Sequence, residues 1–134
     1  MVLKKIQYNL LNWPIHRSYD LISRVCYWSF FESCTKFPEI AGGTNSVNSV
    51  LTKLSKGKIF FKNGAEGVFV AIIPELKSAL VVKIADGATR AAEVAVAGLI
   101  SELKMIDEEQ LEKFKKRSVT NSANQIIGYM NWSI

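Results

Sequence analysis

The hydrophobic residues in the middle of the chain form three short runs that predict β-strands. The runs are KIFFK at residues 58–62, GVFVAII at residues 67–73 and SALVVKIAD at residues 78–86. They are rich in β-branched and aromatic residues and are separated by turn residues, as strands are. Their continuous apolar character predicts burial on both faces beneath helices. The short PELK connection predicts that the last two strands are antiparallel.

Two helices are predicted before these strands. Residues 18–35 show only a blurred apolar stripe, whereas residues 44–56 place apolar side chains at clear helical spacing. The second helix is expected to start at an N-cap, Thr44 or Asn45, and to end with Gly57 as its C′ residue. FPEIAGGTN between them contains a proline and two glycines, so it predicts a break.

The rest of the chain predicts two more helices and a last strand. Residues 88–103 are a strong helix, whose alanines and Gly98 permit close approach to the sheet. Asp107 caps a shorter helix that ends in KFKKR at residues 113–117. Residues 125–132 are expected to form an edge strand. The predicted fold class is α+β, an antiparallel sheet flanked by helices.

Composition favours one globular domain or a part of one. The chain has 134 residues, 49% of them hydrophobic, and a formal net charge of +5. The charges are spread along the chain, so composition does not require a nucleic-acid partner and we expect none. The KFKKR cluster is interpreted first as a solvated helix end and second as a binding patch. Without an apolar run of about 18 residues, we expect a cytoplasmic protein and no membrane partner.

The metal-ligating residue types are few. Cys26 and Cys34 show no CxxC spacing, and His16 is the one histidine. A tetrahedral zinc site takes about four such ligands, so we expect no metal site and no cofactor in this chain. The cysteines are expected to be reduced thiols.

Lys62, in KNGAEG, permits two interpretations. Asn63 and Gly64 are a strong type I′ turn signal, which would make Lys62 an exposed strand end with Glu66 as its cross-strand partner. Alternatively, the glycines of this segment leave the backbone bare for a ligand. Lys62 would then serve as a proton shuttle or as a partner for an oxyanion. The residues alone leave both interpretations open.

Three ordered motifs resemble the rhizobial-type L-asparaginase II family. KFPEIAGGTN (36–45), KNGAEGVFVAIIPE (62–75) and KIADGATRAAEVAVAGLI (83–100) are similar to its HPE-hGGT, K-[ST]-G-A-E-G-V and K-I-x-D-G-x-x-R-A-A-E-V segments. The tail SVTNSANQIIG resembles its N-x-x-G-x-x-V-G stretch. The resemblance covers residues 36–128 and is specific, because the order and spacing agree. It implies a fold like that of serine β-lactamases and penicillin-binding proteins, and hydrolysis of L-asparagine to L-aspartate and ammonia.

The resemblance also implies a site. Lys62 matches the lysine of the family's K-[ST]-G triplet and is therefore the candidate catalytic lysine. Asn63 stands where the family has threonine or serine, which removes a hydroxyl that could position substrate. The implied substrate-binding residues are Thr44, Gly64, Ala65 and Glu66.

Other motif residues are expected to serve the structure. Lys83 and Asp86 match the end of the neighbouring strand, and Asp86 or Gly87 is expected to open the helix that follows. Arg90 and Glu93 lie one helical turn apart and are expected to pair with each other.

The family's chemistry resembles serine acyl transfer, with an S-x-x-K nucleophile and a zinc ion held partly by cysteines. The strings SCTK (33–36) and SELK (101–104) do not stand where that nucleophile belongs, and the histidine expected before Pro38 is Phe37. We therefore expect residues 34–134 to be the C-terminal portion of an asparaginase-like amidohydrolase, inactive alone. Residues 1–33 form a divergent, partly helical segment, irregular in its first 17 residues.

Two other classes of function remain open. The chain could be a non-catalytic interaction module, one half of a two-chain enzyme with an upstream-encoded partner, or a homo-oligomer, because the aromatic run CYWSFF needs a core or a partner to cover it. A basic binding module would require aromatic and basic residues interleaved on one strand face.

Overall fold

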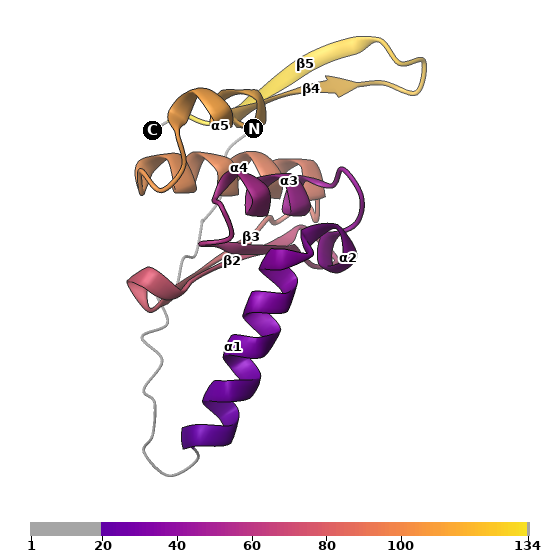
Figure 1. Ribbon diagram of the computed structural model, residues 1–134. Coiled ribbons are helices and arrows are strands. Elements are labelled where there is room, and N and C mark those ends of the chain that lie inside the picture. The colour runs from indigo at the N-terminus through magenta and orange to yellow at the C-terminus, as the bar shows by residue number, and fades with distance from the viewer. Residues whose placement is uncertain (1–19, 134) are drawn as a thin grey trace. The chain divides into compact units, whose positions relative to one another are not determined.

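The computed structural model describes residues 20–133, with the surroundings of side chains described from residue 25. Residues 1–17, which were expected to be irregular, lie outside this range. The described residues form an α+β fold (Figure 1). Its helices are α1 (Asp20–Lys36), α2 (Pro38–Gly42), α3 (Val47–Leu54), α4 (Thr89–Glu102) and α5 (Glu108–Lys115). Its strands are β1 (Phe60–Asn63), β2 (Val68–Ile73), β3 (Ser78–Lys83), β4 (Lys116–Thr120) and β5 (Ile126–Asn131).

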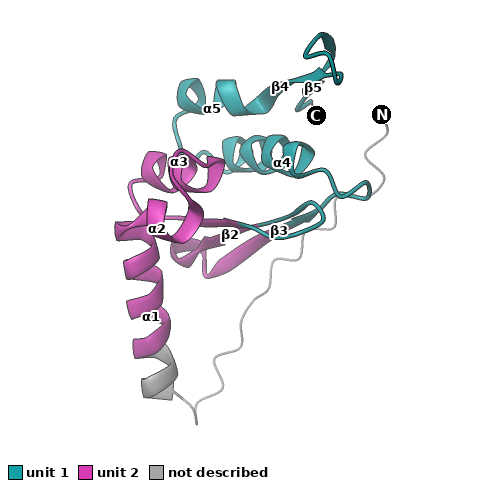
Figure 2. Cartoon of the chain, turned by 90° about the vertical axis from the view of Figure 1, so that its right-hand side faces the viewer, with its two compact units in different colours: residues 1–7, 63–69, 82–134 teal, residues 8–62, 70–81 magenta. Residues whose placement is uncertain are grey.

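The chain divides into two compact units (Figure 2). We call residues 20–62 and 70–81 the N-terminal unit, and residues 63–69 and 82–133 the C-terminal unit. Among the described residues no helix combines the length and apolar character needed to cross a membrane.

The central sheet has the strand order β1-β2-β3, so the three predicted strands are confirmed. The expectation of burial on both faces is wrong. Along β2, half-buried residues alternate with the buried Phe69, Ala71 and Ile73. One face of this strand is therefore fully buried and the other only partly, which is the usual state of an antiparallel sheet. The PELK connection contains a 3₁₀ turn, Pro74–Leu76, and closes with Lys77 in the left-handed region.

Helices α1 and α3 confirm the two helices predicted before the strands. The predicted break contains the short helix α2. Pro38 occupies the first turn of this helix, where the backbone N–H that proline lacks has no partner within the helix anyway. The N-cap of α3 is Ser46 instead of Thr44 or Asn45. Its hydroxyl accepts a hydrogen bond from the Ser49 N–H at 3.2 Å.

The C-terminal end of α3 differs from expectation by one residue. Lys56, with φ 55°, is the C′ residue, and its N–H donates to the Lys53 carbonyl at 2.9 Å. Gly57 follows at C″ and donates to the Thr52 carbonyl at 3.2 Å. These two bonds define a Schellman motif, so a lysine takes the conformation that was assigned to the glycine.

Helix α4 confirms the strong helix predicted at residues 88–103, and β5 confirms the predicted last strand. Gly98 permits a close approach, as predicted, but to the Trp132 indole: a Cβ at Gly98 would lie 2.1 Å from Trp132 Cδ2. Glu93 pairs with Arg117 and not with Arg90.

Strand β4 was not predicted. The KFKKR segment ends α5 at Lys115, and its last two residues begin β4, which pairs antiparallel with β5 as a separate two-stranded sheet.

Candidate functional site

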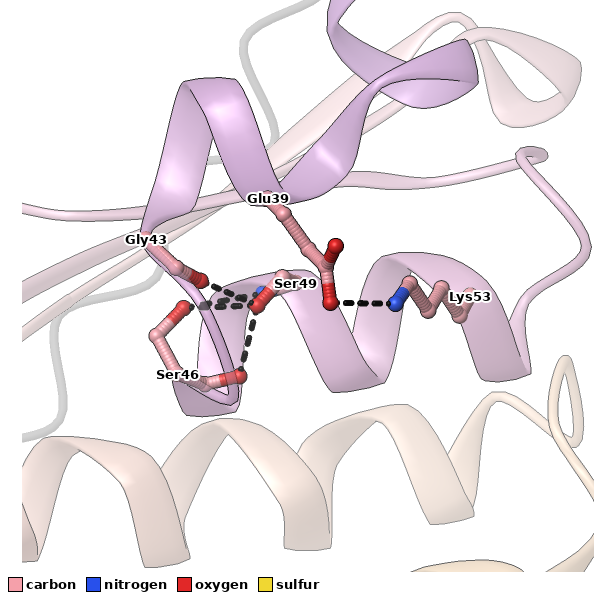
Figure 3. A network of polar contacts seen from close by, with 5 residues as sticks. All are labelled: Glu39, Gly43, Ser46, Ser49 and Lys53. Carbon is pink, nitrogen blue, oxygen red and sulfur yellow. Dashed lines mark hydrogen bonds and ion pairs between the residues drawn. The ribbon is translucent and has the colours of Figure 1, made fainter.

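The loop that precedes α3 is held by short polar contacts within the N-terminal unit (Figure 3). The Ser49 hydroxyl lies 2.7 Å from the Gly43 carbonyl, to which it can donate, and 2.9 Å from the Ser46 hydroxyl. Gly43 itself has φ 93°, a conformation that glycine adopts readily. An ion pair between Glu39 and Lys53, at 2.7 Å, joins α2 to α3. The A-G-G-T segment therefore has a defined backbone.

Gly42 in this loop lies against the start of α3. A Cβ at Gly42 would be 3.0 Å from Asn48 Cβ and 3.3 Å from the Ser49 nitrogen. Thr44, a predicted substrate-binding residue, is exposed. Gly42 and Gly43 therefore serve the backbone geometry of this loop.

Lys62 stands near the end of β1, and its side chain reaches the same loop. Its ammonium Nζ donates a hydrogen bond to the Ala41 carbonyl at 3.0 Å, across 21 residues of sequence. Lys62 is exposed. One contact within the N-terminal unit thus brings the lysine of K-N-G-A-E-G to the segment A-G-G-T. The sequence alone did not predict this contact.

The turn after β1 lies three residues later than predicted, with Glu66-Gly67 at its centre in place of Asn63-Gly64. The Gly64 N–H pairs with the Val68 carbonyl at 2.8 Å, so the ladder continues past Asn63. Glu66 (φ 55°) and Gly67 (φ 69°) are the central residues, and positive φ at both central positions is the mark of a type I′ turn. Glu66 is therefore a turn residue, and the expected cross-strand pairing of Glu66 with Lys62 is wrong.

The K-I-A-D-G segment clamps this turn within the C-terminal unit. The Lys83 ammonium donates to the Glu66 carbonyl, and the Ile84 N–H donates to the Gly67 carbonyl at 3.0 Å. A Cβ at Gly67 would lie 2.9 Å from the Gly87 carbonyl carbon. The two motifs therefore require each other, which supports the structural role predicted for Lys83.

Asp86 serves the start of α4. Its carboxylate accepts a hydrogen bond from the Ala88 N–H at 2.9 Å. Ala88 is the N-cap residue of α4, so Asp86 takes the position from which it was predicted to open this helix.

Gly64, Ala65 and Glu66 are exposed. Among residues 20–133, the N–H groups of Ala65 and Glu66 have no backbone acceptor, so they can donate to a bound molecule. The Gly64 N–H, the Ala65 carbonyl and the Glu66 carbonyl are already engaged within the turn.

Cys34 of α1 lies within electrostatic reach of Lys62. Burial raises the pKa of the Cys34 thiol, and the positive charge of Lys62 opposes this by lowering the pKa. Burial prevails, so the thiol form is favoured. Sequence reasoning gave Cys34 no role beside Lys62, because the two residues are far apart along the chain.

Neither S-x-x-K string has the geometry of an activated serine. The Ser33 hydroxyl donates to the Ser29 carbonyl of its own helix at 2.7 Å, while the Lys36 ammonium lies over the Phe37 ring. An isolated hydroxyl engaged in this way is a weak nucleophile.

In the second string, the lysine beside Ser101 is Lys115 and not Lys104 of the string itself. The Lys115 ammonium lies 3.5 Å from the Ser101 hydroxyl. Hydrogen bonds from Lys115 to Glu112 and then Glu108 raise the pKa of Lys115. A lysine held in its charged form cannot take the proton of a serine, so this cluster fastens α5 to α4 and does no acid–base chemistry.

Within the part of the chain that the structure describes, no three His, Cys, Asp or Glu side chains converge in a group that could hold a metal ion. The zinc ion implied by the resemblance therefore has no fitting donor set among these described residues.

The model of the family described as L-asparaginase II matches residues 21–132 of the chain. No curated protein matches the chain. The match begins within α1 and extends beyond β5, so it includes every motif discussed above.

Proposed function

The chain belongs to the L-asparaginase II family, and from this premise we propose that it forms one wall of a site that hydrolyses L-asparagine to L-aspartate and ammonia. The observation that carries the proposal is the hydrogen bond from the Lys62 ammonium to the Ala41 carbonyl at 3.0 Å. It holds the lysine of one family motif against the backbone of another. The proposed substrate contacts are Thr44, Gly64, Ala65 and Glu66.

The exposed groups at this wall suit the charges of the substrate and of its reaction. The Lys62 ammonium has three N–H donors and gives one to Ala41, so the others can bind a substrate carboxylate or the oxyanion that forms when the amide carbonyl is attacked. The N–H groups of Ala65 and Glu66 supply further donors. The Glu66 carboxylate can accept from the ammonium group of asparagine.

The nucleophile of the reaction is proposed to come from outside the described residues. Ser33 donates to Ser29, and Ser101 lies beside a charged lysine, so neither serine is activated. We therefore propose that the chain is inactive alone and completes a site with another polypeptide segment.

The surface of α1 favours a two-chain arrangement as a second candidate. Val25 and Trp28 lie three residues apart on α1 and are 58% and 53% exposed. Large exposed apolar side chains that are adjacent on a helix are characteristic of interaction surfaces. In this form the chain is the non-catalytic half of an enzyme whose other half carries the serine.

Two measurements on the purified chain test the proposal. The first is ammonia release from L-asparagine, for which we expect no turnover from a sample that circular dichroism shows to be folded. The second is a titration with L-asparagine monitored by amide NMR signals. We expect shifts at residues 64–66 that Lys62→Ala weakens and Lys58→Ala, an exposed-lysine control four residues earlier, leaves unchanged.

Either of two results would refute it. Turnover by the purified chain would show that a nucleophile lies within these 134 residues, and Ser33→Ala would then be the variant to make first. Binding shifts that are equal in wild type and in Lys62→Ala would remove Lys62 from the site.

A further inference from the structure

Strand β5 has two edges, and only one of them is paired with a strand of the described part of the chain. It pairs with β4 on one side in a sheet of two strands, so among residues 20–133 its other edge has no strand neighbour. The strand reads IIGYMN and contains no charge and no proline. Ile127 and Tyr129 on it are 65% and 58% exposed. An exposed, apolar, uncharged edge strand is a template for pairing with another chain.

The opposite edge of the same hairpin is protected. Strand β4 begins with Lys116 and Arg117, and charged side chains on an edge strand oppose pairing with another strand. The Lys116 ammonium lies 4.7 Å from the centre of the Tyr129 ring, and Arg117 pairs with Glu93. The hairpin therefore has one blocked edge and one open edge.

The direction of the backbone groups follows from the ladder. The Trp132 N–H donates to the Lys115 carbonyl at 2.9 Å, and bonded and non-bonded pairs alternate along antiparallel strands. By this alternation Gly128 and Met130 direct their N–H and carbonyl groups toward β4. Tyr129 directs its own groups outward, to the open edge.

We propose that the open edge of β5 pairs antiparallel with β5 of a second copy of this chain, so that two hairpins form one four-stranded sheet. Because β5 carries no charge, two copies meet without like-charge repulsion. The two β4 edges, with Lys116 and Arg117, come to lie on the outside. The assembly therefore closes at two copies and does not continue into a fibre.

The contact is small. A six-residue edge falls short of the roughly 1,000 Å² that a stable interface buries, so the dimer is in exchange with monomer. Its population must rise with protein concentration. This dimer is independent of the proposed catalytic role, because its residues are not those of the asparagine site.

The ladder provides a matched pair of variants. Ser118 of β4 and Tyr129 of β5 lie directly opposite each other, and both direct their N–H groups away from the hairpin. Proline at either position removes an outward N–H without removing a bond of the ladder. Tyr129→Pro therefore blocks the open edge, and Ser118→Pro applies the same backbone constraint to the blocked edge. Tyr129→Ala removes the ring but keeps the N–H.

The experiment is sedimentation equilibrium over a concentration series, together with hydrogen exchange of the two amides. We expect wild type and Ser118→Pro to dimerise equally, Tyr129→Ala to dimerise more weakly, and Tyr129→Pro to stay monomeric with an unchanged far-ultraviolet spectrum. In wild type, exchange of the Tyr129 amide should slow as concentration rises, while exchange of the Ser118 amide stays constant.

Three results would overturn the proposal. One is a wild-type chain that is monomeric at every concentration. Another is a dimer that survives Tyr129→Pro, because the contact would then lie elsewhere. The third is protection of the Ser118 amide instead of the Tyr129 amide, which would assign pairing to the β4 edge.

Discussion

Gly98 of α4 is a position where one methyl group tests how the end of the chain packs. A Cβ built at Gly98 would lie 2.1 Å from Trp132 Cδ2, and real Cβ atoms essentially never come closer than 3.0 Å to such a neighbour. The Gly98→Ala variant must therefore move the Trp132 indole away from α4.

Two opposing contributions set the change in the free energy of unfolding. Alanine in place of glycine inside a helix stabilises by about 0.8–1.0 kcal/mol. Trp132 is partly exposed, and a displacement of its indole that exposes roughly half of the ~200 Å² that a tryptophan can bury costs about 2.5 kcal/mol. The contact outweighs the propensity, and we expect Gly98→Ala to destabilise by about 1.5 kcal/mol.

Urea denaturation followed by far-ultraviolet circular dichroism measures this change without depending on tryptophan fluorescence. The matched control is the same substitution in a Trp132→Ala background. There only helix propensity acts, so Gly98→Ala should stabilise by about 1 kcal/mol. A stabilising effect of Gly98→Ala in the otherwise unchanged chain would refute the packing argument.

Three further predictions concern the candidate site. Lys62→Ala removes the charge that lowers the pKa of the Cys34 thiol, so this pKa should rise. Alkylation of Cys34 at fixed pH, followed by mass spectrometry, should then slow. An equal slowing in Lys58→Ala would contradict this reasoning. Glu66 has φ 55°, so Glu66→Gly should raise the free energy of unfolding by about 0.5–1 kcal/mol, and a loss in urea denaturation would mean that the side chain supports the turn. Ser46→Ala removes the N-cap of α3 and should cost about 1 kcal/mol, whereas an unchanged urea midpoint would show that the cap contributes nothing.

The elements with strong periodicity were predictable from sequence. Strands β2 and β3 and helix α4 follow from apolar spacing alone. Strand β4 reads KRSVT, in which Val119 is the only large apolar residue, so no alternation marks it as a strand. These residues form a strand because they pair with β5, and a local sequence pattern carries no information about that pairing.

The candidate site was predictable in its parts but not in its contacts. Asn63-Gly64 is a stronger turn signal than Glu66-Gly67, yet the ladder bond from Gly64 to Val68 moves the turn. What decides the position is tertiary: Gly67 packs against Gly87, twenty residues later. The contact of Lys62 with Ala41 spans 21 residues, so no local sequence pattern predicts it either.

These contacts decide which motif residues can report on function. A side chain at Gly67 would meet backbone at 2.9 Å and would need φ 69°, so loss of activity in such a variant could not be separated from loss of the turn. Lys62 differs, because it is exposed and makes one hydrogen bond to a carbonyl, a contact worth about 0.5–1.5 kcal/mol. Lys62→Ala should therefore leave the fold intact. Any loss of asparagine binding that it causes can then be assigned to the missing ammonium group.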